Sequence, residues 1–173
     1  MLVAGDDPVP ARLAESYARL CAVMRPYGFT ADLEFMPWTA IPNLRSALEV
    51  IAAAGRPENA GVLVDALHYA RSDTRLDEIA SIQRRWLHYA QICDAPADLP
   101  ETQAEYLHMG RCKRLLPGEG GIGLRELYAR LPADLPISVE IPNDLRAPAC
   151  GYREWARQAL VATRTVLDAQ GRR

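Results

Sequence analysis

The sequence predicts an α/β fold, an incomplete parallel (β/α) barrel of about six strand-helix units. Short apolar segments alternate with amphipathic helical segments along the chain, an order that is typical of parallel sheets. No GxGxxG or GxxxxGK[ST] motif follows the first strand, which favours a closed barrel over an open nucleotide-binding sheet. A complete barrel of eight units takes about 250 residues, whereas this chain has 173. We therefore expect roughly two units to be missing or to be supplied by another chain.

The first half of the chain contains three predicted strands with helices between them. Leu13, Tyr17 and Met24 recur at helical spacing, and Asp7 with Pro8 suits the start of that helix. The segment Gly61–Asp65 (GVLVD) is the clearest buried strand in the chain. The strands are predicted at residues 1–4, 29–36 and 61–65, and the helices at residues 11–25 and 42–51.

The same alternation continues through the second half. Helices are predicted at residues 74–83, 100–109, 124–131 and 152–169, and strands at residues 86–93, 115–116 and 137–141. With 49% hydrophobic residues, the chain is long enough to bury one core and too short for two. We therefore expect residues 1–173 to form a single partial barrel domain.

Composition and charge exclude several classes of partner. The net charge is -2 and the basic residues are spread along the chain, so nucleic acid is not an expected partner. No run of about 18 apolar residues and no signal-peptide pattern occurs, and we expect neither a membrane partner nor export. The four cysteines form no CxxC pair. A cytoplasmic protein with reduced cysteines is the simplest interpretation.

Four polar residues stand at or near the carboxyl ends of predicted strands: Glu34, Asp65, Gln91 and Glu140. In a parallel barrel these ends converge on one mouth, where active sites lie. Four oxygen donors from four strands can hold a divalent cation such as Mn²⁺, Mg²⁺, Co²⁺ or Zn²⁺ and leave positions open for substrate. Any one of them alone is more often a loop or cap residue. Their joint placement is what predicts a catalytic metal site.

Other residues are candidates for binding substrate at the same mouth. His68 comes three residues after Asp65 and could contact substrate or metal, and Trp38 could form a wall of the pocket. Arg111 and Arg114 precede the sequence LLPGEGG, whose glycines allow close backbone approach to a ligand. A guanidinium pair beside such a loop could hold a phosphate or a carboxylate.

The motifs EFMPW, DALH, QICDAP, RLLPGEG and SVEIPN resemble those of the xylose isomerase-like, or family 2 AP endonuclease-like, TIM barrels. The resemblance covers essentially the whole chain and implies that the first two strands of the barrel are missing. It also implies that Glu34, Asp65, Gln91 and Glu140 bind a divalent metal. The two glutamates would then be the acid and base, and His68 would contact substrate oxygens.

The resemblance favours a metal-dependent sugar or sugar phosphate isomerase or epimerase, which acts on a polyhydroxy carbonyl substrate through an enediolate. Most epimerases of this superfamily have His as the third ligand, whereas Gln91 is similar to the arrangement in 3-dehydroshikimate dehydratases. A dehydratase, in which Arg111 or Arg114 holds a carboxylate, is therefore the alternative.

A third possibility is a non-catalytic fragment or assembly subunit. Because the open edges of an incomplete barrel invite pairing, we expect a homo-oligomer. DNA repair is the weakest alternative. Three histidines poorly supply a multi-zinc nuclease site, and a chain with a net negative charge poorly supplies a phosphate-binding face.

Overall fold

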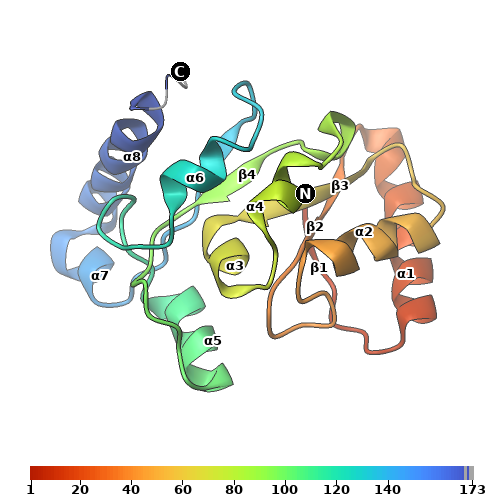
Figure 1. Ribbon diagram of the computed structural model, residues 1–173, viewed down its shortest axis with the longest axis horizontal. Coiled ribbons are helices and arrows are strands. Elements are labelled where there is room, and N and C mark those ends of the chain that lie inside the picture. Colours follow the sequence, from red (N-terminus) through yellow and green to blue (C-terminus); the bar gives the residue numbers. More distant parts are fainter. Residues whose placement is uncertain (170, 172–173) are drawn as a thin grey trace.

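A computed structural model of the protein, which describes residues 1–169 and 171, contains a parallel sheet of five strands (Figure 1). Each strand pairs with the next one along the chain, so the spatial order is β1-β2-β3-β4-β5. An order without reversal is that of consecutive barrel units, whereas an open nucleotide-binding sheet reverses at its switch point. The incomplete α/β barrel is therefore confirmed. The strands are β1 (Leu2–Ala4), β2 (Ala31–Glu34), β3 (Ala60–Asp65), β4 (Ala90–Ile92) and β5 (Ile137–Val139).

The expected strand at residues 115–116 is wrong, and the described sheet has five strands where about six units were predicted. Leu115 forms an isolated antiparallel bridge with Asp94, and β4 pairs directly with β5. The segment holds two residues between Arg114, whose side chain is buried, and Pro117, which has no N–H to donate to a ladder. The described sheet is therefore three strands short of the eight of a closed barrel, not two.

The long helices lie close to their predicted positions, and Figure 1 shows α1 and α8 at opposite ends of the long axis. Helices α3 and α7 were not predicted. The helices are α1 (Pro10–Met24), α2 (Leu44–Ala53), α3 (Ala66–Arg71), α4 (Leu76–Ala80), α5 (Gln103–Cys112), α6 (Leu124–Tyr128), α7 (Arg146–Cys150) and α8 (Tyr152–Asp168), with 3₁₀ turns η1 (Arg25–Tyr27) and η2 (Arg84–Trp86).

Side-chain hydrogen bonds lie near the starts of α1 and α2, and in α2 they form a cap. Helix α1 starts at Pro10, not at the expected Asp7–Pro8, because the Asp7 carboxylate instead accepts hydrogen bonds from Arg12 and from the Val9 N–H. Helix α2 starts after Asn43, whose side chain forms a capping box with Ser46. Side-chain caps of this kind satisfy N–H groups that the helix itself leaves unpaired.

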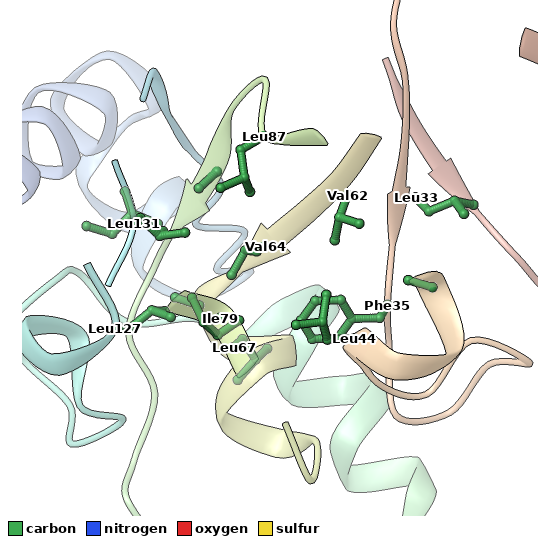
Figure 2. Close-up of a cluster of buried hydrophobic side chains, with 14 of the residues drawn as sticks. Leu33, Phe35, Leu44, Val62, Val64, Leu67, Ile79, Leu87, Leu127 and Leu131 are labelled. Atoms are coloured by element: carbon green, nitrogen blue, oxygen red, sulfur yellow. The ribbon is translucent and has the colours of Figure 1, made fainter. Parts of the chain in front are cut away.

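One face of the sheet packs under the helices and forms the hydrophobic core. Figure 2 shows Val64, Leu67 and Ile79 close together, and all three belong to the same buried cluster. The cluster runs from α1 through the sheet to α8. This is consistent with the single domain predicted for residues 1–173, which stays a prediction.

No described helix is long and apolar enough to cross a membrane, and the cytoplasmic location also stays a prediction.

The other face of the sheet is polar, and strand register sets which residues it carries. Glu34 pairs with Leu63 on β3, and Asp65 pairs with Gln91 on β4. Paired residues share a face, and Leu63 and Asp65 also share one because they are two residues apart on β3. The side chains of Glu34, Asp65 and Gln91 therefore lie on the same side of the sheet. Asp32 lies on this face too, where its buried carboxylate is 2.5 Å from His88 Nδ1. The apolar face thus builds the core, and the polar face carries the candidate site.

A carboxylate holds the glycine-rich loop that follows Arg114. Asp94 Oδ2 accepts hydrogen bonds from the N–H groups of Gly118 (2.8 Å) and Gly120 (3.0 Å). A Cβ at Gly120 would lie 2.2 Å from the Ala95 carbonyl oxygen, so only glycine fits there. The close approach that the glycines were expected to offer to a ligand is thus made by the protein's own Asp94.

We expect Asp94→Ala to lower the free energy of unfolding by about 2 to 4 kcal/mol, because the loop N–H groups lose a charged acceptor. Urea denaturation followed by circular dichroism measures this. The matched control is Asp98→Ala, an exposed carboxylate close by in the chain, for which we expect a change within about 0.5 kcal/mol. Equal effects of the two substitutions would show that Asp94 does not hold the loop.

Candidate metal centre

Six of the eight residues proposed from sequence line one cavity of about 450 Å³ at the carboxyl ends of the strands. Asp65 is fully buried and reaches the site from the end of β3. Gln91 is buried and pairs with Asp65 across the sheet. The structure therefore brings these predicted residues to one end of the barrel. The six that line the cavity are Glu34, Trp38, His68, Arg111, Arg114 and Glu140.

Glu34, Asp65 and His68 form the tightest group. One ligand atom from each lies within 4.8 Å of the others, and all three residues are buried. His68 Nε2 is 3.6 Å from Glu34 Oε1 and 3.9 Å from Asp65 Oδ1. A carboxylate pair and an imidazole at this separation make a donor set suited to a divalent cation.

Local structure explains why His68 joins the two carboxylates. Asp65 is both the last residue of β3 and the N-cap of α3. Its Oδ1 accepts hydrogen bonds from the N–H groups of Leu67 (2.9 Å) and His68 (3.0 Å). The capped first turn therefore brings the His68 side chain back over the strand end.

Several buried polar atoms in this region have no hydrogen-bond partner among the described residues: Glu34 Oε1, His68 Nδ1, Gln91 Oε1 and Glu140 Oε2. Buried polar atoms in folded proteins are nearly always paired, so four orphans on one polar face require an explanation. Three are oxygen atoms, of the carboxylate and amide kinds that bind divalent cations. The residues present thus fit a bound metal ion.

Arg114 supplies a fixed positive charge beside the cluster. Its Nη1 lies 2.7 Å from Asp65 Oδ2 and 3.0 Å from Glu140 Oε2. The contact with Asp65 is a hydrogen bond, whereas the Glu140 oxygen makes an ionic contact without hydrogen-bond geometry. Nε of Arg114 donates to the Gly110 carbonyl (2.8 Å). Arg114 therefore serves the protein's own carboxylates, whereas Arg111 is exposed at the cavity rim.

Burial shifts the pKa values of these groups in opposite directions, up for the two glutamates and down for His68. Burial, together with the nearby Asp65 and Glu140 carboxylates, raises the pKa of Glu34 to about 8. Burial lowers the pKa of His68 to about 4, so its imidazole is neutral at pH 7 and able to bind a metal. Burial also raises the pKa of Glu140, against the opposing charge of Arg114.

Asp65 behaves differently from the two glutamates. Its burial alone would raise its pKa, but the Arg114 guanidinium, the backbone N–H of His68 and, when it is protonated, the His68 imidazole bring that pKa below its ordinary value. Asp65 is therefore ionised at neutral pH, while Glu34 without a cation is mostly protonated.

The ligand set predicted from sequence, Glu34, Asp65, Gln91 and Glu140, stays a prediction. Among the described residues, His68 is the potential metal donor grouped with Glu34 and Asp65, while Glu140 is in contact with Arg114. The Asp-x-x-His spacing is the signal in the sequence that points to His68. No signal marks Gly110, whose missing Cβ leaves room for Trp38, 3.2 Å from the position that a Cβ would take.

Comparison with known proteins gives the same fold. Residues 4–163 match the family model described as xylose isomerase-like TIM barrel. The structure is similar to the IolI protein with a bound zinc atom, with a TM-score of 0.75 and 20% identity over 97% of this chain and 62% of that one. No curated protein matches the chain.

Two further solved structures are similar at lower TM-scores. For 3-keto-D-glucoside 4-epimerase YcjR from E. coli the TM-score is 0.62 and the identity 18%, over 88% of this chain and 53% of that one. For the probable 3-DHS dehydratase AsbF from Bacillus anthracis the TM-score is 0.66 and the identity 18%, over 90% and 56%. This chain spans less than two thirds of each of the three, and at this identity the likeness concerns the fold.

We expect the stability of the metal-free protein to fall as pH rises from 7 to 8.5. A carboxyl with a folded pKa of about 8 and an unfolded pKa of about 4.3 adds stability that is complete below pH 4 and is lost as pH rises through 8. His68 does not contribute in this window, because both of its pKa values lie below 7. Thermal melts with a chelator present measure the slope.

Glu34→Gln should reduce that slope, because an amide does not titrate. Part of the slope should remain, because burial also raises the pKa values of Glu140 and of the Cys21 and Cys93 thiols. Glu58→Gln, at an exposed carboxylate, should leave it unchanged. A slope of the same size in Glu34→Gln would show that the Glu34 carboxyl is ionised in the metal-free fold.

Proposed function

The chain belongs to the xylose isomerase-like TIM barrel family, and on that premise we propose that it is a metal-dependent isomerase or epimerase of a small polyhydroxy carbonyl compound. The observation that carries the proposal is the buried Glu34, Asp65 and His68 group beside a cavity that Glu140 also lines. The zinc in the similar IolI protein and the activity named for the similar YcjR epimerase support it.

The metal would be held by Glu34 and Asp65, with His68 or Gln91 and Glu140 as further donors. When bound, such an ion acts as a Lewis acid that makes the hydrogen next to a substrate carbonyl more acidic. Manganese, magnesium, cobalt and zinc all suit oxygen and imidazole donors. The donor set therefore supports a divalent ion without selecting one.

The protein's own carboxylates would move the proton. Glu34 ends β2 and Glu140 follows β5, so the two reach the cavity from different strands and can face different sides of a bound substrate. One accepts the carbon-bound proton and the other returns one. Raised pKa values for Glu34 and Glu140 suit groups that exchange protons near neutral pH.

The neighbouring residues would orient the substrate. His68 is neutral and can donate a hydrogen bond to a substrate oxygen or bind the metal. Arg111, exposed on the rim, can hold a phosphate or a carboxylate of the substrate. Arg114 keeps the Asp65 carboxylate fixed at 2.7 Å and so positions a metal donor.

A dehydratase is the second candidate, and the Gln91 side chain favours it. Its Oε1 is buried and unpaired, at the point where most epimerases of the superfamily have His, and the probable 3-DHS dehydratase AsbF is among the similar structures. In this reaction the same proton abstraction is followed by loss of hydroxide from the neighbouring carbon. Arg111 would then hold the substrate carboxylate.

We also propose that the protein forms a homo-oligomer. β1 and β5 each have one described neighbour in the sheet, so each presents a free edge of backbone N–H and C=O groups. Such edges are covered in stable proteins, and a second copy related by symmetry is the most economical cover.

Metal binding should stabilise the protein against heat. At a metal concentration one hundred times the dissociation constant, mass action adds about 2.7 kcal/mol if the unfolded chain does not bind. We expect Mn²⁺ to raise the melting temperature of the wild type and of Glu58→Gln. Glu34→Gln should lose most of the increase, because it lacks one charged donor. No increase in the folded wild type would refute the metal site.

The reaction itself can be followed in D₂O by NMR. Metal-loaded protein incubated with a ketose should replace the hydrogen next to the carbonyl by deuterium without loss of water, because one carboxylate exchanges its proton with solvent. Glu140→Gln should slow this at least about 100-fold. A conjugated product that absorbs in the ultraviolet, formed from 3-dehydroshikimate, would favour the dehydratase instead.

A further inference from the structure

A second cavity of about 490 Å³ adjoins the metal centre, and Trp38 and Thr39 line both. The rest of this second cavity is formed by the residue before Trp38 and by the start of α5, where Tyr106 contributes a second aromatic ring. We call it the aromatic subsite. Because the two cavities share a wall, one ligand can extend from the first into the second.

The aromatic rings of the subsite are held by contacts on several sides. The Trp38 ring packs edge to face against His68, with ring centroids 5.0 Å apart. It lies 6.4 Å from the Tyr106 ring at an angle of 57°, and Gly110 allows α5 to come close to its edge. Trp38 and Tyr106 are nevertheless only half-buried. Two partly exposed rings at this angle form an open aromatic corner next to the candidate metal centre, which can accept the apolar face of a ring against one of them.

The polar groups of the subsite exclude an anion. Of the described residues that line it, only Glu101 carries a charge, and that charge is negative. The N–H groups of Glu101 and Thr102, just before α5, are already used, because Glu105 Oε2 accepts from both of them (2.8 Å and 3.0 Å). A phosphate or carboxylate placed here would meet repulsion and find few donors.

Uncharged hydroxyl groups, by contrast, have partners available. The described structure shows no hydrogen bond or ion pair for the Glu101 carboxylate, although its backbone N–H is bonded, and none for the Gln103 amide. Thr39 is already used, since its hydroxyl donates to the Met36 carbonyl (2.9 Å). Glu101 and Gln103 thus provide acceptors and donors at the edge of an aromatic surface, which is the combination that a sugar ring requires.

We propose that the aromatic subsite binds a second, uncharged sugar ring, attached to the polyhydroxy carbonyl unit that reacts at the metal centre. The apolar face of this ring stacks on Tyr106, Trp38 forms the side wall, and the hydroxyl groups of the sugar bond with Glu101 and Gln103. The inference rests on the proposed function and deepens it, because it makes the substrate a glycosylated sugar and places no phosphate at this position.

Three ligands that differ at one position test the proposal: D-fructose, isomaltulose, which carries a glucosyl group on O6, and fructose 6-phosphate. Dissociation constants for the Mn²⁺-loaded full chain are measured by ligand-observed NMR titration. We expect the wild type to bind isomaltulose at least about fivefold more tightly than fructose, the gain from burying one face of a sugar ring. Fructose 6-phosphate should gain nothing from the aromatic subsite.

Tyr106→Ala should reduce the isomaltulose-to-fructose affinity ratio to near one, and Gln103→Ala should reduce it in part. Tyr27→Ala, at an exposed tyrosine beyond α1, should leave the ratio unchanged. Circular dichroism confirms that each variant is folded. Equal affinities for fructose and isomaltulose in the wild type would overturn the proposal. So would failure of all three ligands to bind, or a preference for the phosphate ester that Tyr106→Ala removes.

The outcomes separate this proposal from the proposed function. Deuterium exchange on fructose without a preference for isomaltulose would support the isomerase and reject the sugar subsite. A preference for isomaltulose that depends on Tyr106 and persists without metal, with no exchange, would support the subsite and reject the isomerase.

Discussion

The ion pair between Arg114 and Asp65 is the interaction on which the polar end of the barrel depends. Three carboxylates approach one another there, and burial makes each of them costly to ionise. A guanidinium 2.7 Å from Asp65 and 3.0 Å from Glu140 offsets part of that cost. Asp65 can then stay ionised while it caps α3, and this cap is what places His68 beside Glu34.

The single positive charge of Arg114 does not compensate all three carboxylates, and this bears on function. One guanidinium faces Asp65 and Glu140, while Glu34 is left with a pKa of about 8 and an unpaired oxygen. A group of this kind is poorly matched to a purely structural role, because an apolar residue would fill the same space at lower cost. This uncompensated burial of charge supports the proposal that the cluster binds a cation and a substrate.

The glycine-rich loop shows how the same framework fixes its surroundings. Its N–H groups bind Asp94, and Asn143 Nδ2 donates to the Arg114 carbonyl (3.0 Å). The backbone at and after Arg114 is therefore tied to segments that follow β4 and β5. Precise placement of a catalytic constellation requires this kind of support from neighbouring residues.

The sequence by itself determined the parallel α/β order, the incompleteness of the barrel and the strand ends that carry Glu34, Asp65, Gln91 and Glu140. These follow from local periodicity and from the rule that parallel strands end at one mouth. The extra strand at residues 115–116 was wrong, because two apolar residues cannot show whether they pair in a sheet or bridge a loop.

Only the tertiary structure decided which of the candidate groups face one another. That His68 stands with Glu34 and Asp65, that Arg114 serves the protein's carboxylates, and that Tyr106 lies beside Trp38 all depend on packing between segments far apart in the chain. Local periodicity carries no record of such contacts, because burial and long-range charge arise only when the strands and helices are assembled.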